Sequence, residues 1–70
     1  MSKIYSKKLG KNIQKTRKQK GLSQEKLAEL MGKSRNYIGM VERAELNVPV
    51  SVIFDFAKIL NVEPKEFFNF

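Results

Sequence analysis

Residues 22–43 read LSQEKLAELMGKSRNYIGMVER, and this stretch predicts two short helices joined by a tight turn. Ser23 can cap the first helix, because a serine oxygen accepts a hydrogen bond from a free amide of the first turn. The apolar residues that follow recur at helical spacing and form one face. They are Leu27, Ala28, Leu30 and Met31. Gly32 then ends the helix, since glycine adopts positive φ without steric cost.

A second helix is expected directly after this turn. Ser34 can cap it, and its apolar face then comprises Tyr37, Ile38 and Val41. Ala28 lies where the two helices must approach closely, and its small side chain permits that approach. Residues 23–43 are therefore predicted to form a helix-turn-helix, an arrangement that places its second helix in the major groove of DNA.

The rest of the chain is predicted to add three helices and no strand. We expect an irregular lead-in over 1–5, helices over about 6–20, 50–60 and 64–68, and a loop over 44–49. The inward-facing residues are expected to be Leu9, Ile13, Thr16, Ile53, Phe56, Ala57 and Leu60, with Phe54 partly inward. Asn61 can take the left-handed position that ends a helix, and Pro64 fits the first position of the next. The predicted fold is all-α, a compact five-helix bundle forming one domain over 1–70.

The composition excludes several kinds of site. There is no cysteine and no histidine, which removes disulfides, thiolate zinc sites, the commonest general base and the commonest metal ligand. We therefore expect no enzyme activity, no metal, no cofactor and no small-molecule ligand. Apolar runs are far shorter than the roughly 20 residues of a membrane span, so we expect no membrane association and a cytoplasmic location.

The charge is unevenly distributed along the chain. The formal net charge is +7, and residues 1–20 hold eight basic side chains and no acidic one. Residues 21–43 carry a net charge of +1, and residues 44–70 carry −2. A basic front beside a helix-turn-helix indicates a polyanionic partner, and double-stranded DNA is the one expected.

The chain resembles the phage-repressor/Cro (XRE) family of helix-turn-helix proteins, which has the lambda-repressor-like fold. The residues that carry the resemblance are Gln24, Leu27, Ala28, Gly32, Tyr37, Ile38, Glu42 and Arg43, with Arg17, Asn61 and Val62 at family spacing. It covers about residues 9–68. The Tyr-Ile-x-x-x-Glu-Arg segment followed by Asn47 is similar to small controllers of restriction-modification operons. It also occurs in phage and plasmid repressors and in antitoxins, so these roles stay open, as does a bacterial or phage origin.

Three positions depart from the family pattern. Ala44 stands where the family commonly has glycine, so the end of the second motif helix is expected to be longer or differently closed. The loop over 45–48 has no basic residue, which weakens it as a phosphate clamp. Pro49 replaces the usual serine cap before the helix over 50–60.

Base contacts are expected from the exposed start of the helix over about 34–43. The candidates are Ser34, Arg35, Asn36, Tyr37 and Met40. Arg35 can bond two acceptors of guanine and Asn36 can bond adenine in the same way, each worth about 1–3 kcal/mol of discrimination. Tyr37 can equally be packed in the core, and Met40 can press on a thymine methyl or face a second subunit. The resemblance also implies specificity at Arg35, Asn36 and Met40.

Phosphate contacts are expected from Ser23, Gln24, Lys33 and Arg43. The resemblance implies that Gln24, at the start of its helix, donates to a backbone phosphate, and the helix dipole supports this. It also implies that Arg17 and Glu42 form a partly buried ion pair, a structural rather than DNA-binding role.

The C-terminal end carries more aromatic residues than a small monomer can cover. An apolar patch including Val48, Val50, Phe68 and Phe70 is predicted to form a dimer interface. We expect a homodimeric, sequence-specific repressor or autoregulatory controller that binds an inverted repeat. The alternative is an antitoxin-like module that holds a protein partner through its Phe-rich end and binds DNA for feedback.

Overall fold

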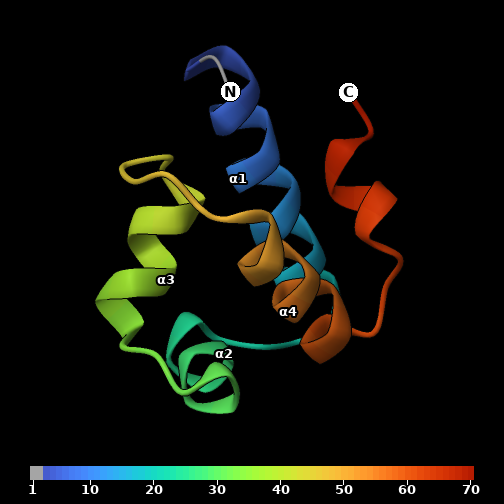
Figure 1. Ribbon diagram of the computed structural model, residues 1–70. Helices are drawn as coiled ribbons and strands as arrows, with labels where there is room; N and C mark the ends of the chain where they lie inside the picture. The colour runs from blue at the N-terminus through green and yellow to red at the C-terminus, as the bar shows by residue number, and fades with distance from the viewer. Residues whose placement is uncertain (1–2) are drawn as a thin grey trace.

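The computed structural model describes residues 3–70, and this part of the chain is all-helical (Figure 1). The elements are α1 (Lys3–Gln19), α2 (Gln24–Met31), α3 (Arg35–Glu42), α4 (Val50–Leu60) and the 3-10 helix η1 (Pro64–Phe68). The all-α prediction is confirmed, with four α-helices and one 3-10 helix instead of five α-helices. The short turns around α2 and α3 place these two helices together, and α1 and α4 cover them (Figure 1).

Helix α1 begins earlier than predicted. It starts at Lys3, so Tyr5 belongs to the helix and not to an irregular lead-in, while Met1 and Ser2 lie outside the described residues. No proline or glycine lies among residues 3–5, so nothing in this segment opposes a helix. The Tyr5 ring also stacks on the Phe70 ring, with centroids 5.8 Å apart. This contact joins the first turn of α1 to the C-terminal end of the chain.

The helices meet around one apolar core. Its buried members are Leu9, Ile13, Leu27, Ala28, Ile38, Val41, Ile53, Phe56, Ala57, Leu60 and Phe67. Two predicted inward positions were wrong. Leu30 is 46% exposed and Phe54 is 54% exposed. Both lie at the edge of an apolar stripe on a short helix, where the spacing of apolar residues alone does not decide which side faces the core.

The predicted helix ends are largely confirmed. The Ser23 hydroxyl accepts a hydrogen bond from the Lys26 amide at 3.0 Å, and the Ser34 hydroxyl accepts one from the Tyr37 amide at 3.1 Å. Gly32 and Asn61 take left-handed conformations with φ of 66° and 58°.

Ala44 and Pro49, two of the positions that depart from the family pattern, lie at the two ends of the loop after α3. Ala44 adopts φ of 59°, so it occupies the left-handed position that glycine usually takes, and α3 is not extended. The Glu45 amide donates to the Met40 carbonyl at 2.9 Å and closes the turn. Pro49 precedes α4 without any side-chain cap, and its carbonyl accepts from the Val52 and Ile53 amides.

Candidate nucleic-acid interface

The exposed face of α3 carries the residues predicted to contact bases. Ser34, Arg35 and Asn36 are exposed, and Tyr37 and Met40 are half-buried. The Ser34 hydroxyl caps the helix, so its oxygen already accepts one hydrogen bond. The Asn36 amide donates to the Met40 sulfur at 3.5 Å. Asn36 and Met40, which are both predicted base contacts, therefore touch each other in the structure.

A shallow groove links this face to the start of α2. It has a volume of about 200 Å³ and is lined by Gln24, Arg35, Asn36, Gly39 and Arg43. Hydrogen-bond donors of α2 (Gln24) and of α3 (Arg35 and Asn36) thus line the same groove.

Lys33 and Tyr37 form a pair at the turn between α2 and α3. The Lys33 ammonium lies 5.2 Å from the centroid of the Tyr37 ring. An ammonium over a ring face is attracted by the ring's negative face. Tyr37 also packs against the core, so part of this ring is structural while its edge stays at the surface.

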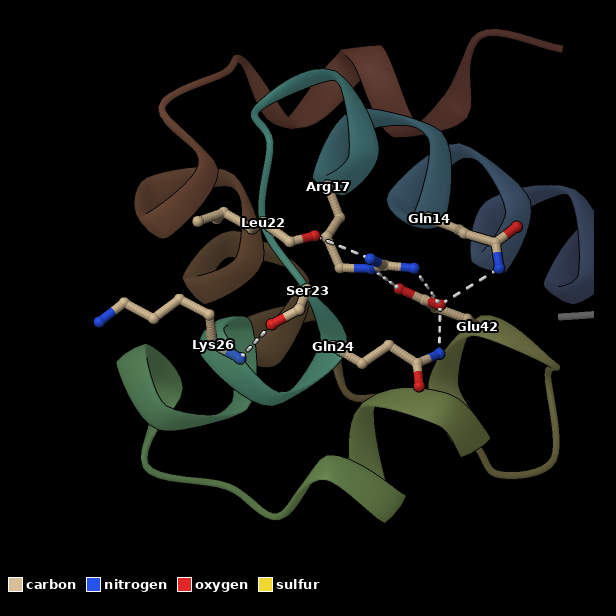
Figure 2. A network of polar contacts seen from close by, with 7 residues as sticks. All are labelled: Gln14, Arg17, Leu22, Ser23, Gln24, Lys26 and Glu42. Carbon is tan, nitrogen blue, oxygen red and sulfur yellow. Dashed lines mark hydrogen bonds and ion pairs between the residues drawn. The ribbon is translucent and has the colours of Figure 1, made fainter.

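The carboxylate of Glu42, at the end of α3, collects donors from two other helices (Figure 2). Arg17 donates to it through Nε at 2.7 Å and Nη2 at 3.2 Å. The Arg17 side chain is 8% exposed and that of Glu42 is 1% exposed. Arg17 also donates to the Leu22 carbonyl at 2.8 Å, just before α2. The pair therefore joins α1, the turn before α2 and the end of α3.

Two glutamine amides complete this network (Figure 2). The Gln24 Nε2 donates to Glu42 Oε1 at 2.9 Å, and the Gln14 Nε2 donates to the same oxygen at 3.3 Å. Sequence reasoning assigned Gln24 to phosphate and did not anticipate this contact. An amide nitrogen carries two hydrogens, so the bond to Glu42 fixes the orientation of the Gln24 amide and leaves one donor for another acceptor.

Arg43 follows α3 directly and is paired with Glu45 in the next loop. Its Nε donates to Glu45 Oε2 at 2.9 Å, and its Nη2 donates to Glu45 Oε1 at 3.2 Å. The hydrogen bond from Arg43 holds the pKa of the Glu45 carboxyl below its usual range. The same bond raises the pKa of the Arg43 guanidinium.

A feature that the sequence did not indicate is the crossing of α1 and α3 at Gly10. A β-carbon at Gly10 would lie 2.6 Å from the Glu42 carbonyl oxygen and 2.7 Å from that of Val41. Only a residue without a side chain fits this contact. Helical periodicity marks Gly10 as an ordinary position beside Leu9, and no sequence signal distinguishes it.

The residues predicted for a dimer interface lie around the first turns of α1. Val50, Phe68 and Phe70 are 63%, 42% and 49% exposed, and Val48 is half-buried. Val48 and Val50 line a hollow of about 380 Å³ together with Ser6. Phe70 stacks on the neighbouring Tyr5, and its ring centroid is 6.4 Å from that of Phe68.

This part of the surface also includes residues outside the prediction. Phe54 lies one turn after Val50 on α4 and is likewise more than half exposed. The Lys8 ammonium lies 5.8 Å from the Phe70 ring centroid, so a basic side chain borders the aromatic cluster.

Residues 3–70 contain neither a metal-binding cluster nor a membrane-spanning helix. They hold no group of three acidic, histidine or cysteine side chains that could bind a metal ion. Over the same residues, no helix has both the length and the apolar character needed to span a bilayer.

Comparisons with known proteins agree on one family. A helix-turn-helix family model (HTH_3) matches residues 13–67. The control protein C.SmaI of Serratia marcescens is 49% identical over 53 residues, which are 76% of this chain and only 63% of that protein. An uncharacterized HTH-type transcriptional regulator of Sinorhizobium fredii, y4dJ, is 33% identical over 83% of this chain and 75% of that protein.

Solved structures give the same result. The restriction-modification controller protein C.AhdI from Aeromonas hydrophila is 42% identical and superposes with a TM-score of 0.88. That match covers 94% of this chain and 96% of the other.

Proposed function

The chain belongs to the helix-turn-helix family of DNA-binding transcription regulators, and on this premise we propose that it acts as a homodimer on an inverted-repeat operator. We assign it to the control of a restriction-modification operon, as repressor or autoregulator. The names of the relatives from Serratia marcescens and Aeromonas hydrophila support this assignment. Residues 1–70 form one DNA-binding domain in this proposal, without a catalytic activity, a cofactor or a small-molecule ligand.

The groove between the start of α2 and the exposed face of α3 is the observation that carries the proposal. Arg35 and Asn36 lie at its wall, and both carry the hydrogen-bond donors that direct contact to base edges in the major groove requires. The proposed base contacts are Ser34, Arg35, Asn36, Tyr37 and Met40. Arg35 would bind guanine and Asn36 adenine, after the Asn36 amide leaves the Met40 sulfur.

Phosphate contacts are proposed at the start of α2 and at the turn between α2 and α3. Gln24 keeps one amide hydrogen on Glu42 and uses the other for a phosphate oxygen, so the buried ion pair orients the phosphate contact. Ser23 directly precedes Gln24, Lys33 lies in the turn between α2 and α3, and both are exposed. The seven exposed lysines of residues 1–20 add long-range attraction, so affinity should fall steeply with salt.

The dimer is proposed to form through the exposed apolar residues near the first turns of α1. Val48, Val50, Phe68 and Phe70 are the predicted members, and the exposed Phe54 extends their surface. A two-fold axis through this surface would present two α3 helices to successive major grooves, about 34 Å apart. Isologous contacts of this kind are the commonest way for identical chains to associate.

Selection of bound duplexes from a random DNA pool tests the specific function. Enrichment of a two-fold-symmetric site supports the proposal, and sedimentation equilibrium of the protein with the selected duplex then gives the number of chains per site. Recovery of duplexes without a shared sequence contradicts it.

The exposed aromatic cluster also favours a second candidate function. Tyr5, Phe68 and Phe70 could hold a toxin-like protein partner, with DNA binding serving feedback. An affinity for the operator that rises only when a co-encoded protein is added would favour this candidate over a self-sufficient regulator.

A further inference from the structure

Arg43, the residue directly after α3, continues the row formed by Arg35 and Gly39. The three residues are four positions apart, so they share one face of the helix. Side chains of a helix lean toward its N-terminus, and the Arg43 guanidinium accordingly lies over Gly39. A β-carbon at Gly39 would be 2.8 Å from Arg43 Nη1 and 3.5 Å from Cζ. The Arg43 guanidinium therefore occupies the space that a side chain at Gly39 would need.

Glu45 holds the other edge of this guanidinium. The carboxylate accepts from Nε and Nη2, at 2.9 and 3.2 Å, which is a side-on pair. Three guanidinium hydrogens remain free, one on Nη2 and two on Nη1, and one from each of these nitrogens forms the donor pair at the tip. They point away from the carboxylate, and the groove shared with Arg35 and Asn36 includes both Gly39 and Arg43.

We propose that Arg43 contacts a second guanine base in the half-site that Arg35 reads, and that Glu45 and Gly39 position it for this contact. The inference rests on the proposed function, since it adds a specificity-determining residue to the same interface. It also replaces the phosphate contact that the sequence suggested for Arg43.

Charge favours a base over a phosphate at this position. The Glu45 carboxylate accompanies the guanidinium and repels a phosphate anion, whereas the O6 and N7 acceptors of guanine carry no net charge. Two parallel donors at the tip of an arginine match these acceptors, a pairing that specifies guanine in the major groove. Lysine cannot reproduce this geometry, because its ammonium is a point charge.

The test compares variants on a duplex selected by the wild-type protein and on duplexes with each half-site base pair substituted in turn. Arg43→Ala should weaken binding to the selected duplex about 5- to 150-fold and abolish the preference at one guanine. Arg43→Lys keeps the charge and should lose the same preference. A phosphate contact would instead survive in Arg43→Lys, and Arg43→Ala would weaken binding to every duplex equally, with a salt slope smaller by about 1. That pattern overturns the proposal.

Two positioning variants separate this role from a purely electrostatic or structural one. Glu45→Gln removes a negative charge and should raise affinity for all DNA, yet the preference at the Arg43 guanine should decrease. Gly39→Ala should raise the unfolding temperature, because alanine is the better helix former, while displacing Arg43 and weakening the same preference. In the Arg43→Ala background, Gly39→Ala should leave that preference unchanged.

The outcomes for the two proposals are distinguishable. If the wild-type protein selects a symmetric site but the Glu45→Gln and Gly39→Ala variants keep every base preference, Arg43 is not positioned by these residues and the inference is wrong. If the wild-type protein selects no site at all, the proposed function fails, and the guanine contact fails with it.

Discussion

The carbonyl oxygen of Glu42 lies 2.6 Å from the point that a β-carbon on Gly10 would occupy. Gly10 thus brings α1 against the last turn of α3, where the Glu42 side chain holds Arg17 and Gln24. The backbone contact and the carboxylate network fix the same end of the helix. The position of the exposed face of α3 therefore depends on Gly10, Arg17 and Glu42, which do not line the surface groove.

Gly10→Ala should destabilise the protein. The substitution forces backbone atoms apart, since the clashing atoms are carbonyl oxygens and not a flexible side chain. Overpacking costs about 1–3 kcal/mol, only partly offset by a gain of about 1 kcal/mol in helix propensity. Thermal and urea unfolding measure the change, with Gly39→Ala as the matched helical control that should not be destabilised. Equal stability of Gly10→Ala and the wild type would show that the crossing adjusts freely.

Arg17→Met should be strongly destabilising, because it leaves the Glu42 carboxylate buried without its main partner. Removing one member of a buried pair typically costs about 3–5 kcal/mol. The double variant Arg17→Met with Glu42→Leu should recover much of the loss, since no charge is then left unpaired. A double variant as unstable as the single one would contradict this account of the pair, and urea unfolding of both decides it.

Gln24→Ala should weaken DNA binding at one specific phosphate. A hydrogen bond to a charged group is worth about 1.5–3 kcal/mol, so affinity should fall at least about tenfold. Duplexes with single methylphosphonate substitutions locate the contact. One neutralised phosphate should weaken the wild type but have no further effect on Gln24→Ala. An equal response of both proteins at every phosphate would exclude this role.

Val50→Glu should dissociate the proposed dimer, because it places a charge in an apolar interface. Substitution of a central interface residue costs about 2 kcal/mol or more, which raises the dimer dissociation constant about thirtyfold. Leu30→Glu is the control, since Leu30 is similarly exposed but lies on α2. Sedimentation equilibrium should show a monomer for Val50→Glu and a dimer for Leu30→Glu. Loss of the dimer in both variants, or in neither, would place the interface elsewhere.

Much of the fold could be predicted because its signals are local. Serine caps, Gly32, Asn61 and the apolar spacing of α4 each act within one helical turn, and the structure follows them. The start of α1 was predicted too late, and the contact made by its first turn, Tyr5 on Phe70, joins residues that are distant in the sequence.

The site was less predictable, because many of its contacts join residues from different elements of the fold. Residue types at the start of α3 indicate donors for base edges, and the structure exposes Arg35 and Asn36 there. Which donors are already occupied depends on contacts between elements. The bond from Gln24 to Glu42 joins α2 to α3, and the pairing of Arg43 with Glu45 follows from the left-handed turn at Ala44.

The most direct test of the central claim is selection of duplexes from a random DNA pool by the wild-type protein and by Arg35→Ala. The account predicts that the wild type enriches a two-fold-symmetric site and that Arg35→Ala loses the preference for one guanine in each half-site. Binding to all duplexes without a shared sequence, or a selected site that is the same for both proteins, would contradict base contact by α3.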